Sequence, residues 1–188
     1  MAATAAPATL PPYSQVKIVG SRTIEFSDGF YYNFENAQLL SQAQNVDQMG
    51  HLQQIGERVM WRLTLNAWIR GGDSLYQWER MYEGAMGWKT YLAWIADAAG
   101  LRNNIMKKGG VSLSVQQHQT MEEQGNFVEK AGGVEALVGA VFEDCGRDHD
   151  VTSEVMRRLG IYWPESAGDS AQLKAFLQQL RTIGIIRG

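Results

Sequence analysis

The sequence predicts an all-α protein, a helical domain of about seven helices with an extended N-terminal arm. Three observations predict this class. Apolar residues recur at helical spacing along most of the chain, capping residues precede several of these stretches, and glycine follows several of them. With 188 residues, 45% of them hydrophobic, the chain is long enough for one domain with a single core.

The N-terminal part gives the weakest pattern. Residues 1–14 are small or apolar and uncharged, and we expect a flexible tail there, followed by one domain over residues 15–188. Tyr13–Ser27 contains β-branched and aromatic residues that alternate poorly, which favours a short hairpin or an extended arm.

Four helices are expected in the first hundred residues, each from its caps and apolar spacing. The strongest is His51–Arg70, which places Leu52, Ile55, Val59, Leu63 and Ala67 on one stripe and is stopped by two glycines. The other three are Asn36–Ala43 with an asparagine cap, a segment from Asp73 or Ser74 to Met86, and Trp88–Ala99 before Gly100.

The second half begins with Lys107–Gln124, whose Gly, Ser and Gln content predicts a surface loop or a short helix. Val128–Glu143 predicts a helix although it contains Gly132, Gly133 and Gly139. Each glycine costs about 1 kcal/mol in a helix interior, so we expect close packing to hold this helix at the centre of the domain. Further helices are predicted over Asp150–Leu159 and Asp169–Ile183.

Charge and cysteine content limit the classes of function. Lys and Arg number 17 and Asp and Glu number 20, giving a net charge of −3 and an isoelectric point near 5.6. No overall positive field therefore attracts a phosphate backbone, which disfavours RNA as a partner without excluding it. The single cysteine, Cys145, cannot form an internal disulfide, and no uninterrupted apolar run spans a membrane. We expect an intracellular, cytoplasmic protein.

Polar side chains on two of the predicted helices are the candidate chemistry. Gln53 and Glu57 are four residues apart and so share a helix face, close to His51 and Gln54. Glu135 lies among apolar neighbours, so its carboxylate either faces outward or is buried beside a partner. No phosphate-binding loop, dinucleotide fingerprint or histidine spacing typical of a metal site occurs.

These segments resemble the ribonuclease III domain over roughly residues 29–163. Leu52–Met60 (LQQIGERVM) is similar to the family's first signature, L-E-F-L-G-D-x-V-L. Tyr32–Leu40 (YNFENAQLL) resembles the family's opening helix, and Val134–Gly146 (VEALVGAVFEDCG) resembles its D-x-x-E-A-x-x-G-A-x-x-x-D segment. The ending Leu159–Pro164 resembles small single-domain members from filamentous fungi, without the appended double-stranded-RNA-binding domain.

The resemblance implies a homodimer that cleaves double-stranded RNA with Mg²⁺ held by four carboxylates. Here the four positions are Gln53, Glu57, Gly132 and Glu135, so two acids are absent and a third is longer by one methylene. Because Mg²⁺ demands near-octahedral oxygen ligands, we expect ordinary cleavage to be lost and no metal or cofactor to be held.

We therefore expect a degenerate site repurposed for a small apolar molecule, with metal-free isomerase, dehydratase or cyclase chemistry as one possibility. The expected catalytic residues are Glu57, Glu135 and His51, and the expected ligand contacts are Gln53, Gln54 and Trp61.

Several alternatives stay open. The two glutamates could be structural, satisfied by Arg58, Arg62 or backbone donors. The domain could be a non-catalytic RNA-binding module, similar to degenerate ribonuclease III domains of fungal mitochondrial ribosomes, or a weak endonuclease that retains Mg²⁺. For the expected homodimer, an apolar seam is available from Trp61, Leu65 and Trp68.

Overall fold

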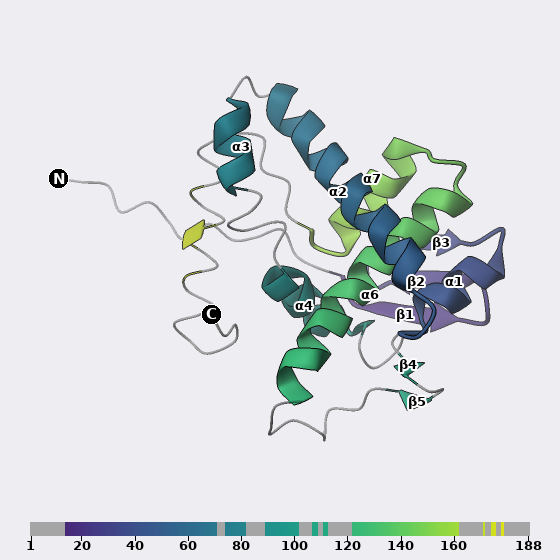
Figure 1. Ribbon diagram of the computed structural model, residues 1–188. Coiled ribbons are helices and arrows are strands. Elements are labelled where there is room, and N and C mark those ends of the chain that lie inside the picture. Colours follow the sequence, from purple (N-terminus) through teal and green to yellow (C-terminus); the bar gives the residue numbers. More distant parts are fainter. Residues whose placement is uncertain are drawn as a thin grey trace.

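The computed structural model describes residues 14–70, 74–81, 89–101, 107–108, 111–112 and 122–161, together with residues 171, 174–175 and 178. This part of the chain is mostly helical, and it also contains a three-stranded sheet (Figure 1). The expectation of a purely all-α protein is therefore wrong, although helices dominate as predicted. In the described residues no helix has the length and apolar character needed to cross a membrane.

The expected N-terminal arm is an antiparallel sheet in the order β1-β2-β3. Its strands are β1 (Val16–Val19), β2 (Thr23–Phe26) and β3 (Tyr31–Asn33). Gly20 and Gly29 take positive φ values of 65° and 88° in the two connections, a conformation that favours glycine. The sheet is tied to helical segments far along the chain, because the Val16 amide donates to the carbonyl of Ala99 at 2.9 Å.

The helices of the first half follow the predictions closely. Asn36 caps α1 (Ala37–Ala43) by accepting from the Gln38 amide, as its position predicts. The long helix α2 (Gly50–Arg70) begins one residue before the predicted start, and α4 (Lys89–Ala98) ends before Gly100. α3 (Leu75–Met81) is the described part of the segment predicted to reach Met86; the remainder lies outside the described residues.

The second half contains two corrections. The predicted loop over residues 107–124 includes two short paired strands, β4 (Lys107–Lys108) and β5 (Val111–Ser112). The helix expected from Val128 is α6 (Glu122–Asp144), which starts six residues earlier, in a polar Glu- and Gln-containing stretch compatible with a helix. α7 (His149–Arg158) is capped by Asp148, and most of the predicted helix 169–183 lies outside the described residues.

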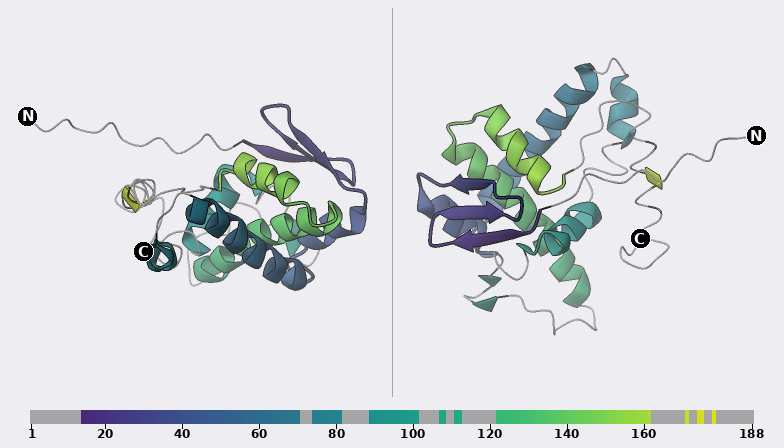
Figure 2. Two further views of the ribbon diagram at one scale, coloured as in Figure 1. Left: turned by 90° about the horizontal axis from the view of Figure 1, so that it is seen from above. Right: turned by 180° about the vertical axis from the view of Figure 1, so that it is seen from behind.

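α6 is the central helix, as the glycines predict. Residues 131–141 are all buried, and α6 packs against α1, α2, α4 and α7. Figure 2 shows the three-stranded sheet and α2 on opposite sides of this helical core. The core includes the fully buried rings of Trp68 and Trp78, whose centroids are 5.9 Å apart. Trp68 is therefore a core residue and is not available for an apolar seam between subunits.

α2 and α6 approach so closely that only glycine fits at their crossing. A Cβ atom added to Gly56 would lie 1.8 Å from the carbonyl oxygen of Glu135. From the other helix, a Cβ atom on Gly139 would lie 2.0 Å from the carbonyl oxygen of Leu52. The first half of α2 is thereby held directly against the turns of α6 that carry Glu135.

The last residue of α6 anchors the start of the helical region. The Asp144 carboxylate accepts from the Tyr32 hydroxyl at 2.8 Å, and from the backbone amides of Glu35 at 3.0 Å and Asn36 at 2.8 Å. Burial and this carboxylate raise the pKa of Tyr32, so its hydroxyl stays a donor at any ordinary pH. These bonds fix the connection between β3 and α1 against α6.

Candidate site at Glu135

The Glu135 carboxylate is buried and fully engaged. Its side chain is 2% exposed and stands on the central helix α6. The Lys89 ammonium, at the start of α4, donates to both carboxylate oxygens at 2.7 Å, and Gln53 Nε2 on α2 donates to Oε2 at 2.9 Å. Three helices therefore contribute one polar group each to a cluster formed by Gln53, Lys89 and Glu135.

A small residue in α6 makes room for this cluster. A Cβ atom added to Gly132 would lie 2.9 Å from the Met49 Cε atom and 3.1 Å from the Gln53 side-chain oxygen. Gly132 therefore lies directly against Gln53, one turn of helix before Glu135. Of the four positions that the resemblance relates to metal ligands, Gln53, Gly132 and Glu135 are neighbours in space.

The fourth position, Glu57, is exposed on α2, one turn after Gln53. Its negative charge raises the pKa of Glu135, although burial is the largest cause of that increase. Hydrogen bonding and charge attraction from Lys89, together with the bond from Gln53, act in the opposite direction. The net direction is upward, because a carboxylate that leaves water loses more solvation than its partners restore.

The other expected site residues stay on the outer surface of α2. His51, Gln54 and Trp61 are exposed, Trp61 to 41%, and none of them is a hydrogen-bond partner of Glu135 within the described chain. Gln54 and Trp61 are seven residues apart, so they share a face of α2 with Glu57 between them. The structure thus brings Gln53 and Glu135 together and leaves the remaining expected residues around the outside.

Lys89 is a site residue that the sequence pattern does not predict. The sequence offers Arg58 and Arg62 as partners for the glutamates, but both are exposed on α2, and Glu135 is paired with a lysine 46 residues earlier in the chain. One signal was present in the sequence. Lys89 lies in the first turn of an apolar helix, where the helix dipole makes a positive charge slightly unfavourable and a carboxylate partner therefore favourable.

The donor set at Glu135 does not fit the Mg²⁺ that the resemblance implies. Gly132 offers no ligand, Gln53 directs its amide nitrogen at the carboxylate, and the Lys89 ammonium occupies both oxygens of Glu135. Mg²⁺ requires oxygen ligands at about 2.0–2.1 Å in an octahedral arrangement, which these groups do not provide. Among the residues the structure describes, no three His, Cys, Asp or Glu side chains gather as a metal site.

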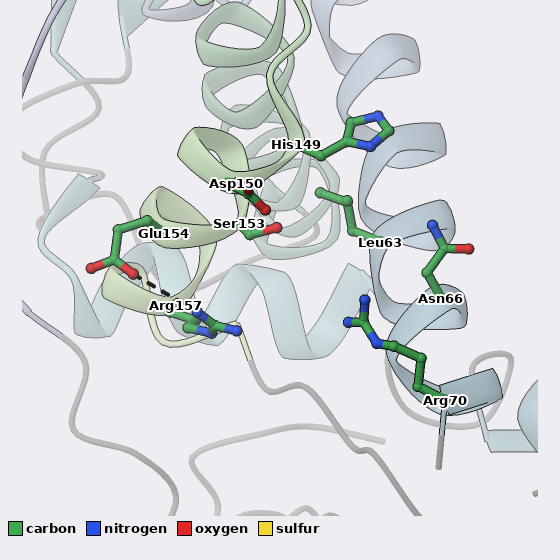
Figure 3. A pocket seen from close by; sticks show the side chains of 8 residues that line it. All are labelled: Leu63, Asn66, Arg70, His149, Asp150, Ser153, Glu154 and Arg157. Carbon is green, nitrogen blue, oxygen red and sulfur yellow. Dashed lines mark ion pairs between the residues drawn. The ribbon is translucent and has the colours of Figure 1, made fainter. Parts of the chain in front are cut away.

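A second feature lies between α2 and α7, away from this cluster. A hollow of about 480 Å³ is lined on α2 by Leu63, Asn66 and Arg70. On the α7 side the lining includes His149, Ser153 and Arg157 (Figure 3). Its closest point on α2, Leu63, is ten residues after Gln53, which corresponds to about 15 Å along the helix.

Comparisons with protein-family models, with curated proteins and with solved structures found no match to this chain. The ribonuclease III resemblance therefore rests on the motifs themselves and stays a prediction.

Proposed function

We propose that this chain is a ribonuclease III-type domain that has lost metal-dependent RNA cleavage and binds a small molecule in the former metal cleft. The observation that carries the proposal is the contact between Lys89 and both carboxylate oxygens of Glu135. Under this proposal the ammonium takes the electrostatic role that a divalent cation has in the family. The single cysteine favours a cytoplasmic location for this activity.

The proposal explains why two acidic positions can be lost together. A buried carboxylate requires a compensating charge or proton, because desolvation of the isolated ion is very unfavourable. Lys89 supplies one positive charge to Glu135, whereas Mg²⁺ supplies two and needs additional anions around it. With Gln53 and Gly132 in place of acids, the buried charge of Glu135 is balanced by Lys89, and the remaining acid, Glu57, is exposed to solvent.

Lys89 is the part of the pair that a ligand would meet first. Its side chain is 32% exposed, whereas that of Glu135 is 2% exposed. The ammonium can donate a hydrogen bond or a proton to a carbonyl or hydroxyl oxygen of a ligand, and the exposed Glu57 supplies a carboxylate base on the adjacent face of α2. We propose this acid and base pair for metal-free isomerase, dehydratase or cyclase chemistry, with Glu135 holding Lys89 in position.

The expected homodimer is part of the proposal. Trp61 and Ile69 on α2 are 41% and 56% exposed, and Leu75 on α3 is 52% exposed. We propose that a second copy of the chain covers this apolar surface, with Leu65 at its centre in place of the buried Trp68. Sedimentation at micromolar concentration should give a dimer that Trp61→Asp converts to a monomer, and a monomeric wild type would contradict this part.

The first experiment measures Mg²⁺ and Mn²⁺ binding by calorimetry and the cleavage of duplex RNA in parallel. We expect neither in the wild type. Cleavage by the wild type that Glu135→Gln abolishes would refute the proposal and restore the endonuclease alternative. Retention on duplex RNA with a steep salt dependence, without cleavage, would instead favour the RNA-binding alternative.

The small-molecule part needs a probe at the cluster itself. The Met49 methyl group lies beside Gly132 and Gln53, so ε-methyl ¹³C labelling of methionine reports there by NMR. We expect small hydroxy-ketone fragments to shift the Met49 signal in the wild type and not in Lys89→Leu. Lys130→Leu is the matched control, because Lys130 also joins α6 to α4, through Asp97 at 2.6 Å. Equal responses in both variants would remove Lys89 from the site.

A further inference from the structure

The Lys89 side chain connects solvent with a buried carboxylate. Its ammonium is 2.7 Å from both carboxylate oxygens of Glu135, and the two side chains are 32% and 2% exposed. Lys17 differs, because its side chain is 63% exposed and its partner Glu25 is itself 37% exposed. Lys89 therefore combines a side chain that a ligand can reach with a carboxylate that solvent hardly reaches.

The buried carboxylate limits which reactions the Lys89 nitrogen can undergo. An uncompensated carboxylate in a water-poor site is very unfavourable, so Glu135 requires a cation at this nitrogen. Acylation of the nitrogen would remove its positive charge. Condensation with an aldehyde or ketone retains it, because the protonated imine carries the same single charge as the ammonium. The ion pair thus favours carbonyl compounds over acyl donors as covalent partners.

We propose that Lys89 forms a protonated imine with a small aldehyde or ketone, and that Glu135 is the counter-ion of this imine. The inference rests on the function proposed above, since it names the substrate class of the same site.

The reaction needs only the groups of the ion pair and the carbonyl compound. Glu135 accepts one proton from the Lys89 ammonium, and the freed amine attacks the carbonyl carbon. A second proton passes from the nitrogen to the carbonyl oxygen and gives a carbinolamine. Glu135 then returns its proton to the new hydroxyl group, which leaves as water while the carbon–nitrogen double bond forms. One ammonium and one carbonyl group thus give one protonated imine and one water.

The surroundings of Glu135 suit this transfer of a proton. Burial raises the pKa of its carboxyl group, so it accepts a proton more readily than an exposed glutamate does. Gln53 Nε2 donates to Oε2 at 2.9 Å and so fixes the carboxylate beside the Lys89 nitrogen. A protonated imine withdraws electrons from the adjoining carbon and makes a proton there easier to remove. The exposed Glu57, one helix turn after Gln53, can accept that proton.

The first test ranks the lysines of the full-length protein by their rate of reductive alkylation. Acetone and 4-dimethylaminobenzaldehyde are the two carbonyl probes, cyanoborohydride reduces the protonated imine, and peptide mass spectrometry assigns each adduct. Reactivity that follows exposure alone ranks Lys17 ahead of Lys89. We expect Lys89 to be modified about tenfold faster than Lys17, because a positioned carboxylate transfers the protons. A rate at Lys17 equal to or above that at Lys89 with both probes would overturn the proposal.

The second test measures the pH at which the imine loses its proton. The protonated imine of 4-dimethylaminobenzaldehyde absorbs at a longer wavelength than the neutral imine. Glu135→Gln should lower the midpoint of this change by about 1–3 pH units, because an adjacent carboxylate favours the cation. Asp97→Asn is the matched control and should leave the midpoint unchanged, since Asp97 pairs with Lys130 across the same two helices. An unchanged midpoint in Glu135→Gln would overturn the proposal, and the ranking of lysines decides it if that variant does not fold.

Lys89→Arg locates the imine, because arginine keeps the positive charge and does not form an imine with these probes. The long-wavelength absorbance should be lost, and its retention would place the imine at another residue and overturn the proposal. A Met49 signal that shifts with hydroxy-ketone fragments, without an adduct at Lys89, would overturn the imine and leave the small-molecule site in place. Absence of both the shift and the adduct would refute both proposals.

Discussion

Replacing Gly56 with alanine should separate α2 from α6 and strongly destabilise the protein. The added methyl group would lie 1.8 Å from the Glu135 carbonyl oxygen and 2.9 Å from the Gly139 amide nitrogen. Non-bonded heavy atoms need roughly 3.5 Å, so the shortest contact is too close by about 1.5–2 Å. Both obstacles are helix backbone, which cannot move aside as the end of a flexible side chain can.

The size of the effect follows from two opposing contributions. Alanine is favoured over glycine in a helix by about 1 kcal/mol. Overpacking of a close-packed interior typically costs 1–3 kcal/mol and sometimes more, and displacement of a whole helix belongs at the upper end. We expect a net loss of about 2 kcal/mol in the free energy of unfolding, which for a domain of this size lowers the melting temperature by roughly 4–8 °C.

The assay is urea unfolding followed by circular dichroism at 222 nm, with Gly50→Ala as the matched control on the same helix. An added Cβ atom at Gly50 meets no atom within 4 Å, so this variant should stay within about 0.5 kcal/mol of the wild type or gain stability. If Gly56→Ala were as stable as Gly50→Ala, the close contact between α2 and α6 would not exist and the argument would be refuted.

Two further predictions concern carboxylates on α6. Asp144→Asn should cost about 2 kcal/mol, because it weakens three charge-assisted bonds that join β3 and α1 to α6, and urea unfolding measures the loss; no change would contradict the anchoring role. Lys89→Leu should cost about 3 kcal/mol at pH 7, the lower end for a broken buried pair because Lys89 is partly exposed. The difference in free energy of unfolding between Lys89→Leu and the wild type should become smaller towards pH 4. The pKa of Glu135 in the folded protein is raised above its ordinary value of 4.5. Stability is therefore greatest at low pH, where Glu135 is protonated in both the folded and the unfolded chain, and it falls as the pH rises. Without Lys89 this fall in stability should be steeper. A difference independent of pH would contradict it.

Helices were predictable where a long apolar stripe exists. The α2 stripe gives four buried side chains (Leu52, Val59, Leu63 and Ala67), and the predicted and observed boundaries differ by one residue. The sheet was harder to predict because its strands are only three or four residues long, too short for alternation to be distinctive. Its position also depends on bonds to distant residues, such as that from the Ser14 amide to the Arg158 carbonyl.

The candidate site was predictable in part, because two of its residues lie on helices with a strong sequence pattern. Gln53 and Glu135 occupy motif positions on these helices, and the structure places Gln53 Nε2 2.9 Å from Glu135 Oε2. Lys89 was not predicted as a site residue because its contact with Glu135 depends on how α4 packs on α6. The residue pattern along a single helix carries no information on that packing. Its place in the first turn of an apolar helix, where a positive charge is slightly unfavourable, was only a weak sign of a carboxylate partner.

The helix crossing and the site are one structural feature. The side chain of Gln53 is shorter than that of Lys89. Its amide reaches Glu135 because Gly56 and Gly139 allow the backbones of α2 and α6 to touch. Lys89 has a longer and more flexible side chain, which tolerates a small movement of α6. A variant that widens the crossing should therefore break the bond from Gln53 first and leave the ion pair with Lys89. The glycines thus set the geometry of the site as well as the packing, and substitutions at the two positions should be coupled to changes at Glu135.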